Sequence, residues 1–92
     1  MGKVDCCSLA NLDLVFYSND HLPAHFHARS SNWEIKVFIE TTTESALHYK
    51  IKWSKLRRKM PSAKSLRAIA AMVCEHRVEL LEEWESKVLS GS

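Results

Sequence analysis

The chain has 92 residues, a formal net charge of +2, 46% apolar residues and 26% charged residues. A chain of this length has room for one small core, so we expect a single domain over residues 1–92, and its composition disfavours a disordered protein. It contains no apolar run of about 18 to 20 residues and no signal-peptide pattern, which predicts a cytoplasmic protein without a membrane segment.

Cys6 and Cys7 are adjacent and Cys74 lies far away, a spacing that predicts neither a disulfide framework nor a thiolate zinc site. Residues 12–17 form a short apolar run of strand-forming residues that ends in Ser-Asn-Asp turn chemistry, so they predict a first strand. Pro23 fixes its own φ and disfavours helix at the residue before it. Residues 20–24 are therefore expected to form a loop.

From His25 the residues alternate as in a strand, and after Ser-Ser-Asn the alternation resumes over residues 33–40. The two runs predict a hairpin. In its second arm Ile35, Val37 and Ile39 share one face, while Glu34, Lys36 and Glu40 share the other. After three threonines, a fourth strand is predicted with Leu47, Tyr49, Ile51 and Trp53 toward the core and His48, Lys50 and Lys52 toward water.

The last third of the chain changes to helical spacing. Pro61 and Ser62 predict a helix start, followed by a buried stripe of Leu66, Ile69, Ala70 and Val73. A second stripe contains Arg77, Leu80, Leu81, Trp84 and Val88. We expect two helices that meet near His76, or one helix bent there. Strands followed by helices predict an α+β fold, with a small three- to four-stranded, mainly antiparallel sheet and two C-terminal helices packed on one face.

Two segments resemble a known family. The stretch Tyr-Ser-Asn-Asp-His-Leu-Pro-Ala-His-Phe-His at 17–27 is followed by His-Arg-Val-Glu-Leu-Leu-Glu-Glu-Trp at 76–84. Both are similar to motifs of the bacterial family called domain of unknown function 4160, over about residues 15–85. Ala24 stands where the family usually has a second proline, and the basic segment before Pro61 is longer than usual.

The resemblance implies an α+β fold with the histidine loop beside the sheet and two C-terminal helices. It implies no established activity. Genes of this family tend to lie beside the gene of another small protein, in an arrangement similar to toxin and antitoxin pairs.

The histidine-rich stretch offers three kinds of site. His25 and His27 are two residues apart on a strand and share a face, with Phe26 opposite. With His21 or Asp20 they could bind zinc or another divalent metal, whose bound water would be a nucleophile. The metal-ligand candidates are therefore His21, His25, His27 and Asp20.

The other two hypotheses involve no metal. The histidines could be hydrogen-bonded structural residues, with Asp20 accepting N–H groups of the turn. Alternatively, a metal-free acid/base or phosphate-contacting site could use Arg29 to hold an anion. The candidates for catalysis are His25, His27, Asp20 and Arg29.

Residues 50–67 contain no acid and many bases, namely Lys50, Lys52, Lys55, Arg57, Arg58, Lys59, Lys64 and Arg67. Such a segment predicts a surface for nucleic acid or for an acidic partner protein, although lysines and arginines can also merely cover apolar neighbours with their stems. Tyr49 and Trp53 alternate with the lysines and are expected to point into the core, which disfavours stacking on bases.

The preferred hypothesis is a non-enzymatic, toxin/antitoxin-like module that binds a small partner protein or nucleic acid. Its binding residues would be Lys50, Lys52, Lys55, Arg57, Arg58 and Lys59. A homodimer is compatible with it. The alternative is a small metal-dependent or acid/base hydrolase, nuclease-like, built on the histidine cluster. The first predicts binding without turnover, and the second predicts a turnover that is lost when His25 is replaced.

Overall fold

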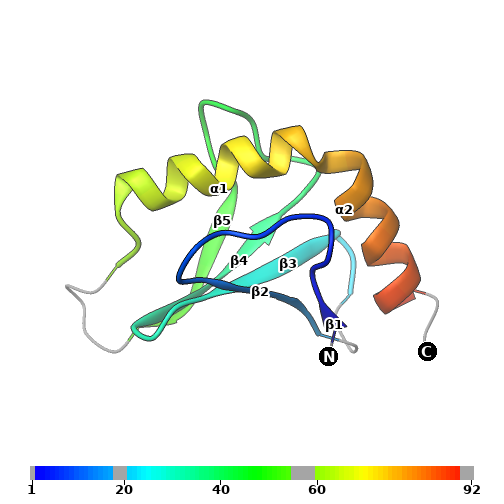
Figure 1. The fold of residues 1–92 in the computed structure, drawn as a ribbon, viewed down its shortest axis with the longest axis horizontal. Helices are drawn as coiled ribbons and strands as arrows, with labels where there is room; N and C mark the ends of the chain where they lie inside the picture. The colour runs from blue at the N-terminus through cyan, green and yellow to red at the C-terminus, as the bar shows by residue number, and fades with distance from the viewer. Residues whose placement is uncertain (1, 18–20, 55–59, 90–92) are drawn as a thin grey trace.

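The structure is a computed structural model that describes residues 2–17, 21–54 and 60–89. Its elements are β1 (Gly2–Lys3), β2 (Asp13–Phe16), β3 (His25–Arg29), β4 (Trp33–Phe38), β5 (Tyr49–Ser54), α1 (Ala63–Glu75), α2 (Arg77–Trp84) and the π-helical turn η1 (Glu85–Leu89). The strands form one antiparallel sheet in the order β1-β2-β3-β4-β5. In Figure 1 the two helices cover one face of this sheet.

The predicted α+β fold is confirmed, with five strands where three to four were expected. The additional strand is β1, which has two residues and pairs with Phe16 and Val15 of β2. Two residues are too short to show an alternation, so the sequence could not indicate this strand.

The predicted hairpin is formed by β3 and β4. Ser30 begins its turn, and the Ser30 hydroxyl accepts hydrogen bonds from the N–H groups of Asn32 and Trp33, both at 3.1 Å. The resulting register pairs Phe26 with Val37 on the helix side. It places His27, Arg29 and Glu34 on the opposite side of the sheet, which we call the outer face.

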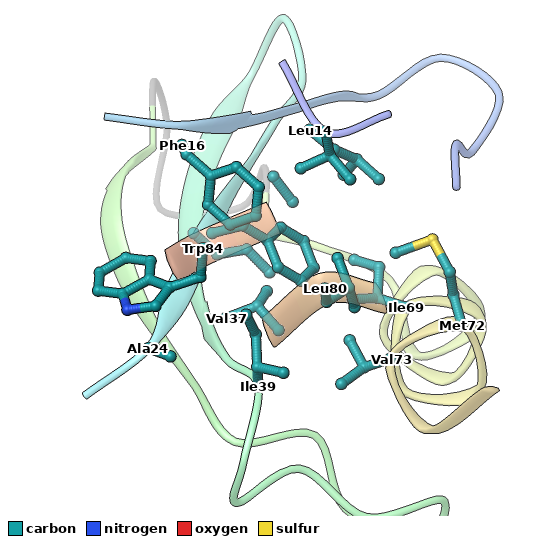
Figure 2. Close-up of a cluster of buried hydrophobic side chains, with 14 of the residues drawn as sticks. Leu14, Phe16, Ala24, Val37, Ile39, Ile69, Met72, Val73, Leu80 and Trp84 are labelled. Carbon is teal, nitrogen blue, oxygen red and sulfur yellow. The ribbon is translucent and has the colours of Figure 1, made fainter. Parts of the chain in front are cut away.

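The hydrophobic core lies between the helices and the inner face of the sheet, as Figure 2 shows. Its fully buried large side chains include Phe16, Phe26, Ile35, Ile39, Ile69, Leu80 and Trp84. Trp84 is 1% exposed, and its ring centroid lies 6.3 Å from that of Phe16 and 5.2 Å from that of His25. Trp84 therefore joins α2 to the sheet, as the spacing of the second stripe predicted.

The two helices meet at His76, as predicted. Ser62 is the N-cap of α1, and its hydroxyl accepts a hydrogen bond of 3.1 Å from the N–H of Ser65. At the other end of α1, the N–H of His76 donates to the carbonyl of Met72. Across the described part of the chain, no helix has the length and apolar character needed to cross a membrane.

The chain before β2 is attached to α2 by charged side chains. The carboxylate of Glu83 accepts hydrogen bonds from the N–H groups of Asp5 and Cys6, both at 2.8 Å, and lies 2.8 Å from Lys87 Nζ. Burial raises the pKa of Glu83, but the Cys6 side chain, Lys87 and the two N–H groups outweigh it and lower the pKa to about 2. The carboxylate is therefore charged over the whole physiological range.

The register between β4 and β5 shifts by one residue. Ile35 pairs with Ile51, whereas Glu34 pairs with Trp53, so Lys52 is an extra residue in a β-bulge. The prediction that Trp53 points into the core is wrong, because the bulge turns the side chains that follow it to the other face. Trp53 is 39% exposed on the outer face, beside Glu34.

Candidate functional site

A cluster of polar side chains on the outer face surrounds Glu34. Glu34 is 3% exposed, although it carries a carboxylate and lies near the start of β4. Five side chains approach its two oxygens: Tyr17, His27, Arg29, Lys52 and Trp53. They come from three segments, namely the residue that follows β2, strand β3 and strand β5. Strand alternation turns all of them to the outer face, and the bulge adds Lys52 beside Trp53.

The contacts divide between the two carboxylate oxygens. The Oε2 atom accepts a hydrogen bond of 3.1 Å from the Tyr17 hydroxyl and lies 3.3 Å from Lys52 Nζ and 3.1 Å from His27 Nδ1. The Oε1 atom accepts a hydrogen bond of 3.3 Å from Trp53 Nε1 and lies 3.3 Å from Arg29 Nε. Buried carboxylates need such partners, since an isolated buried charge is strongly unfavourable.

The surroundings of Glu34 fix its protonation state. Burial raises its pKa, but the hydrogen bond and positive charge of Lys52, the Tyr17 hydroxyl and the nearby His27 together hold the pKa below its ordinary value. Burial and the negative charge of Glu34 raise the pKa of Tyr17. Glu34 is therefore an anion and Tyr17 a protonated donor at neutral pH.

His25 and His27 share the outer face, and Phe26 is fully buried on the helix side, as predicted. Both histidines are buried, and their ring centroids are 5.3 Å apart. His25 Nδ1 lies 2.8 Å from the carbonyl oxygen of Pro23, a contact that requires the proton on Nδ1. With its ring against Trp84, His25 connects the sheet to α2, whereas His27 belongs to the Glu34 cluster.

The predicted metal ligands are only partly described. His21 is exposed, and Asp20 lies outside the described residues. Among the residues that are described, no three histidine, cysteine, aspartate or glutamate side chains are grouped as metal ligands would be. The zinc or other divalent metal site therefore stays a prediction, and nothing in the described geometry adds to it.

A pocket of about 260 Å³ opens beside the Glu34 cluster. It is lined by His27, Lys36, Lys50, Ile51 and Lys52. Lys36 and Lys50 are cross-strand partners, so their side chains lie next to each other on the outer face. Three lysines therefore surround one pocket and give its lining a positive charge.

The basic segment predicted from the sequence is thus described in part. Lys50 and Lys52 lie on β5, and both are exposed. Lys64 and Arg67 are exposed on α1. The remaining candidates, Lys55, Arg57, Arg58 and Lys59, lie outside the described residues.

Reasoning from the sequence did not identify Tyr17, Glu34, Lys36 or Trp53 as residues of the site. The alternation places Glu34 on the face opposite Ile35, and only its position opposite Arg29 in the hairpin indicates a partner. Lys36 was recognised as outward-facing, but its pairing with Lys50 depends on the register of β5. Trp53 was assigned to the core because a bulge leaves no mark in the alternation of residues.

The chain matches the model of one protein family. The family model described as domain of unknown function (DUF4160) matches residues 12–85, which span β2 to the end of α2 and include the Glu34 cluster. Neither a curated protein nor a solved structure matches the chain. The family match covers well over half of the sequence, and the chain therefore belongs to the DUF4160 family.

Proposed function

We propose that this protein is a non-enzymatic nucleic-acid-binding module, one member of a toxin/antitoxin-like pair in the bacterial cytoplasm. The observation that supports binding is the exposed ring of Trp53 on the same face as Lys36, Lys50 and Lys52. Proteins that bind single-stranded nucleic acid combine a basic groove for phosphates with aromatic side chains on which bases stack. The toxin/antitoxin-like pair is proposed from the family resemblance, and the cytoplasmic location is proposed from the sequence.

The Glu34 cluster holds the proposed binding surface in shape. The hydrogen bond from Trp53 Nε1 to Glu34 fixes the orientation of an indole that is 39% exposed. Lys52 Nζ lies 4.5 Å from the centre of the Tyr17 ring, within the range of a cation–π contact. Lys52 also forms an ion pair with Glu34, whereas Lys36 and Lys50 are not among the described partners of Glu34. The charges of Lys36 and Lys50 are therefore available to phosphate. The cluster therefore separates structural cations from binding cations.

The first test is charge reversal on the outer face. Lys36→Glu with Lys50→Glu is expected to lower the affinity for a labelled single-stranded RNA or DNA oligonucleotide at least about ten-fold, and to reduce its dependence on salt. Both side chains reach the solvent, so the fold should persist. Fluorescence anisotropy at several salt concentrations measures the effect.

The matched control reverses the same amount of charge on α1, with Lys64→Glu and Arg67→Glu, and is expected to retain most of the affinity. Trp53→Phe should bind better than Trp53→Ala if the ring stacks on bases. Equal losses in the two charge-reversal variants, or an affinity that does not change with salt, would contradict binding through this face.

One contact favours a second candidate, a metal-free phosphodiesterase. His27 Nδ1 lies 3.1 Å from Glu34 Oε2, and His27 lines the lysine pocket. A carboxylate that orients an imidazole is the arrangement used for general base catalysis. In cleavage of a phosphodiester, His27 would take the proton of the attacking hydroxyl as one P–O bond forms and another breaks. The lysines would stabilise the charge that develops on the phosphoryl oxygens.

Turnover separates the two candidates. The proposed binding module is expected to leave bis(p-nitrophenyl) phosphate and labelled RNA uncleaved. A turnover that falls at least about a hundred-fold in His27→Ala, with the fold intact, would replace it by the acid/base enzyme. Loss of the same turnover after treatment with a chelator would instead favour a metal site that uses Asp20 or His21.

A further inference from the structure

Strand β5 forms one edge of the sheet. Within the part of the chain that the structure describes, it pairs on one side only, with β4. Its six residues are half-buried or exposed, and Ile51 is 37% exposed. An edge strand of this kind can pair with an extended segment of another chain.

The hydrogen-bond ladder shows which backbone groups of β5 face outward. The N–H of Phe38 donates to the carbonyl of His48 at 2.9 Å. Hydrogen-bonded pairs alternate along an antiparallel ladder, so the next bonded pair is Lys36 with Lys50. The N–H and carbonyl groups of Tyr49 and Ile51 consequently point away from β4, outward from the edge of the sheet.

A pocket lies on each of the two sides of this edge. On the outer side is the lysine pocket of about 260 Å³. On the helix side is a pocket of about 230 Å³ between β5 and α1, whose lining includes the apolar side chains of Leu47, Tyr49, Leu66 and Ala70. Successive side chains of an added strand would point alternately to the two sides.

We infer that β5 binds an extended segment of a partner protein in which acidic and apolar residues alternate. The acidic side chains face Lys36, Lys50 and Lys52, and the apolar side chains enter the pocket beside Leu66. A second copy of this chain fits poorly, because its β5 would bring lysines against lysines. The lysines and the bulge discourage uncharged strands from pairing here, so they select for an acidic one.

This inference does not require nucleic-acid binding, since it is based on the edge of β5 and on the apolar pocket. It has a consequence for the proposed function, however. The bound segment covers Lys50, which the proposed nucleic-acid surface also uses, so partner protein and nucleic acid compete for this lysine.

The probe is a capped peptide of alternating valine and glutamate with six residues, the length of β5. It is expected to bind saturably, as followed by backbone amide shifts in NMR. N-methylation of the two peptide amides that face Tyr49 and Ile51 is expected to weaken binding at least about ten-fold, because two backbone hydrogen bonds are lost. Replacing the glutamates of the peptide by lysines should abolish binding.

Two protein variants test the same edge. Ile51→Pro removes an outward N–H without removing a bond to β4, and such prolines are tolerated in edge strands. It should weaken binding of the peptide, but less than the double N-methylation does, because only one hydrogen bond is lost. Ile51→Ala keeps the N–H and should bind more tightly than Ile51→Pro. Thermal melting checks that both variants are folded.

Three results would overturn the inference, each judged against the affinity of the valine–glutamate peptide: the N-methylated peptide binds equally well, the valine–lysine peptide binds equally well, or hexaglutamate binds equally well. The last result would mean that charge alone accounts for the binding. Because the N-methylated peptide leaves the protein unchanged, this comparison remains decisive even if Ile51→Pro does not fold. Oligonucleotide affinity is measured separately without peptide, so nucleic-acid binding and strand addition can fail independently.

Discussion

Trp84→Ala is expected to lower the free energy of unfolding by about 3–5 kcal/mol, which in so small a protein is enough to leave much of it unfolded. Trp84 is 1% exposed, and it lies between Phe16 on the sheet and His25 at the start of β3. Removing the indole leaves a cavity between α2 and the sheet, and closing it would require both to move. Urea denaturation followed by circular dichroism measures the loss.

Val78→Ala on the same helix is the matched control. Val78 is 65% exposed, so its truncation should change the free energy of unfolding by less than about 0.5 kcal/mol. Trp84→Phe should fall between the two, since it keeps an aromatic ring in the core. A cost below about 1 kcal/mol for Trp84→Ala would mean that α2 does not depend on this contact.

Glu34→Gln is expected to lower the free energy of unfolding by about 1–3 kcal/mol at pH 7. Glutamine keeps the volume of the side chain, but one of its oxygens is replaced by a donor that faces other donors. Arg29 and Lys52 are 39% and 48% exposed, so they can turn to water and contribute little. The loss comes mainly from Tyr17 and His27, which are less accessible to solvent.

The same substitution has a defined pH dependence. The pKa of Glu34 is lower in the folded protein than in the unfolded chain. The contribution of the Glu34 charge to the free energy of unfolding is therefore complete above the pKa of the unfolded chain, about 4.3. It is lost as the pH falls through the lower pKa of the folded protein. As the pH falls from the unfolded pKa through the folded pKa of Glu34, the difference in free energy of unfolding between wild type and Glu34→Gln should become smaller.

Glu40→Gln is the control for this series, because Glu40 is an exposed carboxylate just past β4. It should change stability little at any pH. Equal stability of wild type and Glu34→Gln at pH 7 would show that the five contacts of Glu34 only offset the cost of burying its charge.

Much of the fold follows from periodicity that is visible in the sequence. The alternation after Pro23 predicted the hairpin of β3 and β4, and with it the common face of His25 and His27. The stripe that contains Trp84 predicted its burial. These features depend on neighbours two to four residues apart, which is the range over which a sequence pattern is informative.

The site itself depends on contacts that no local pattern encodes. Glu34 is buried because Tyr17, from before β3, and Lys52 and Trp53, from β5, converge on it. That convergence requires the register between β4 and β5, which the bulge at Lys52 changes. An alternating sequence predicts which residues share a face only as long as no residue is inserted into the ladder.

The bulge also determines at which position β5 can lose one residue without a change of fold. Lys52 has no partner of its own in the ladder with β4, and Ile51 and Trp53 already face opposite sides. A chain that lacked Lys52 would return to a regular ladder with Trp53 still on the outer face, whereas loss of Lys50 would turn Tyr49 away from the core. In relatives of this protein, deletion of one residue at the bulge is therefore compatible with the same architecture. Deletion of one residue elsewhere in β5 is disruptive.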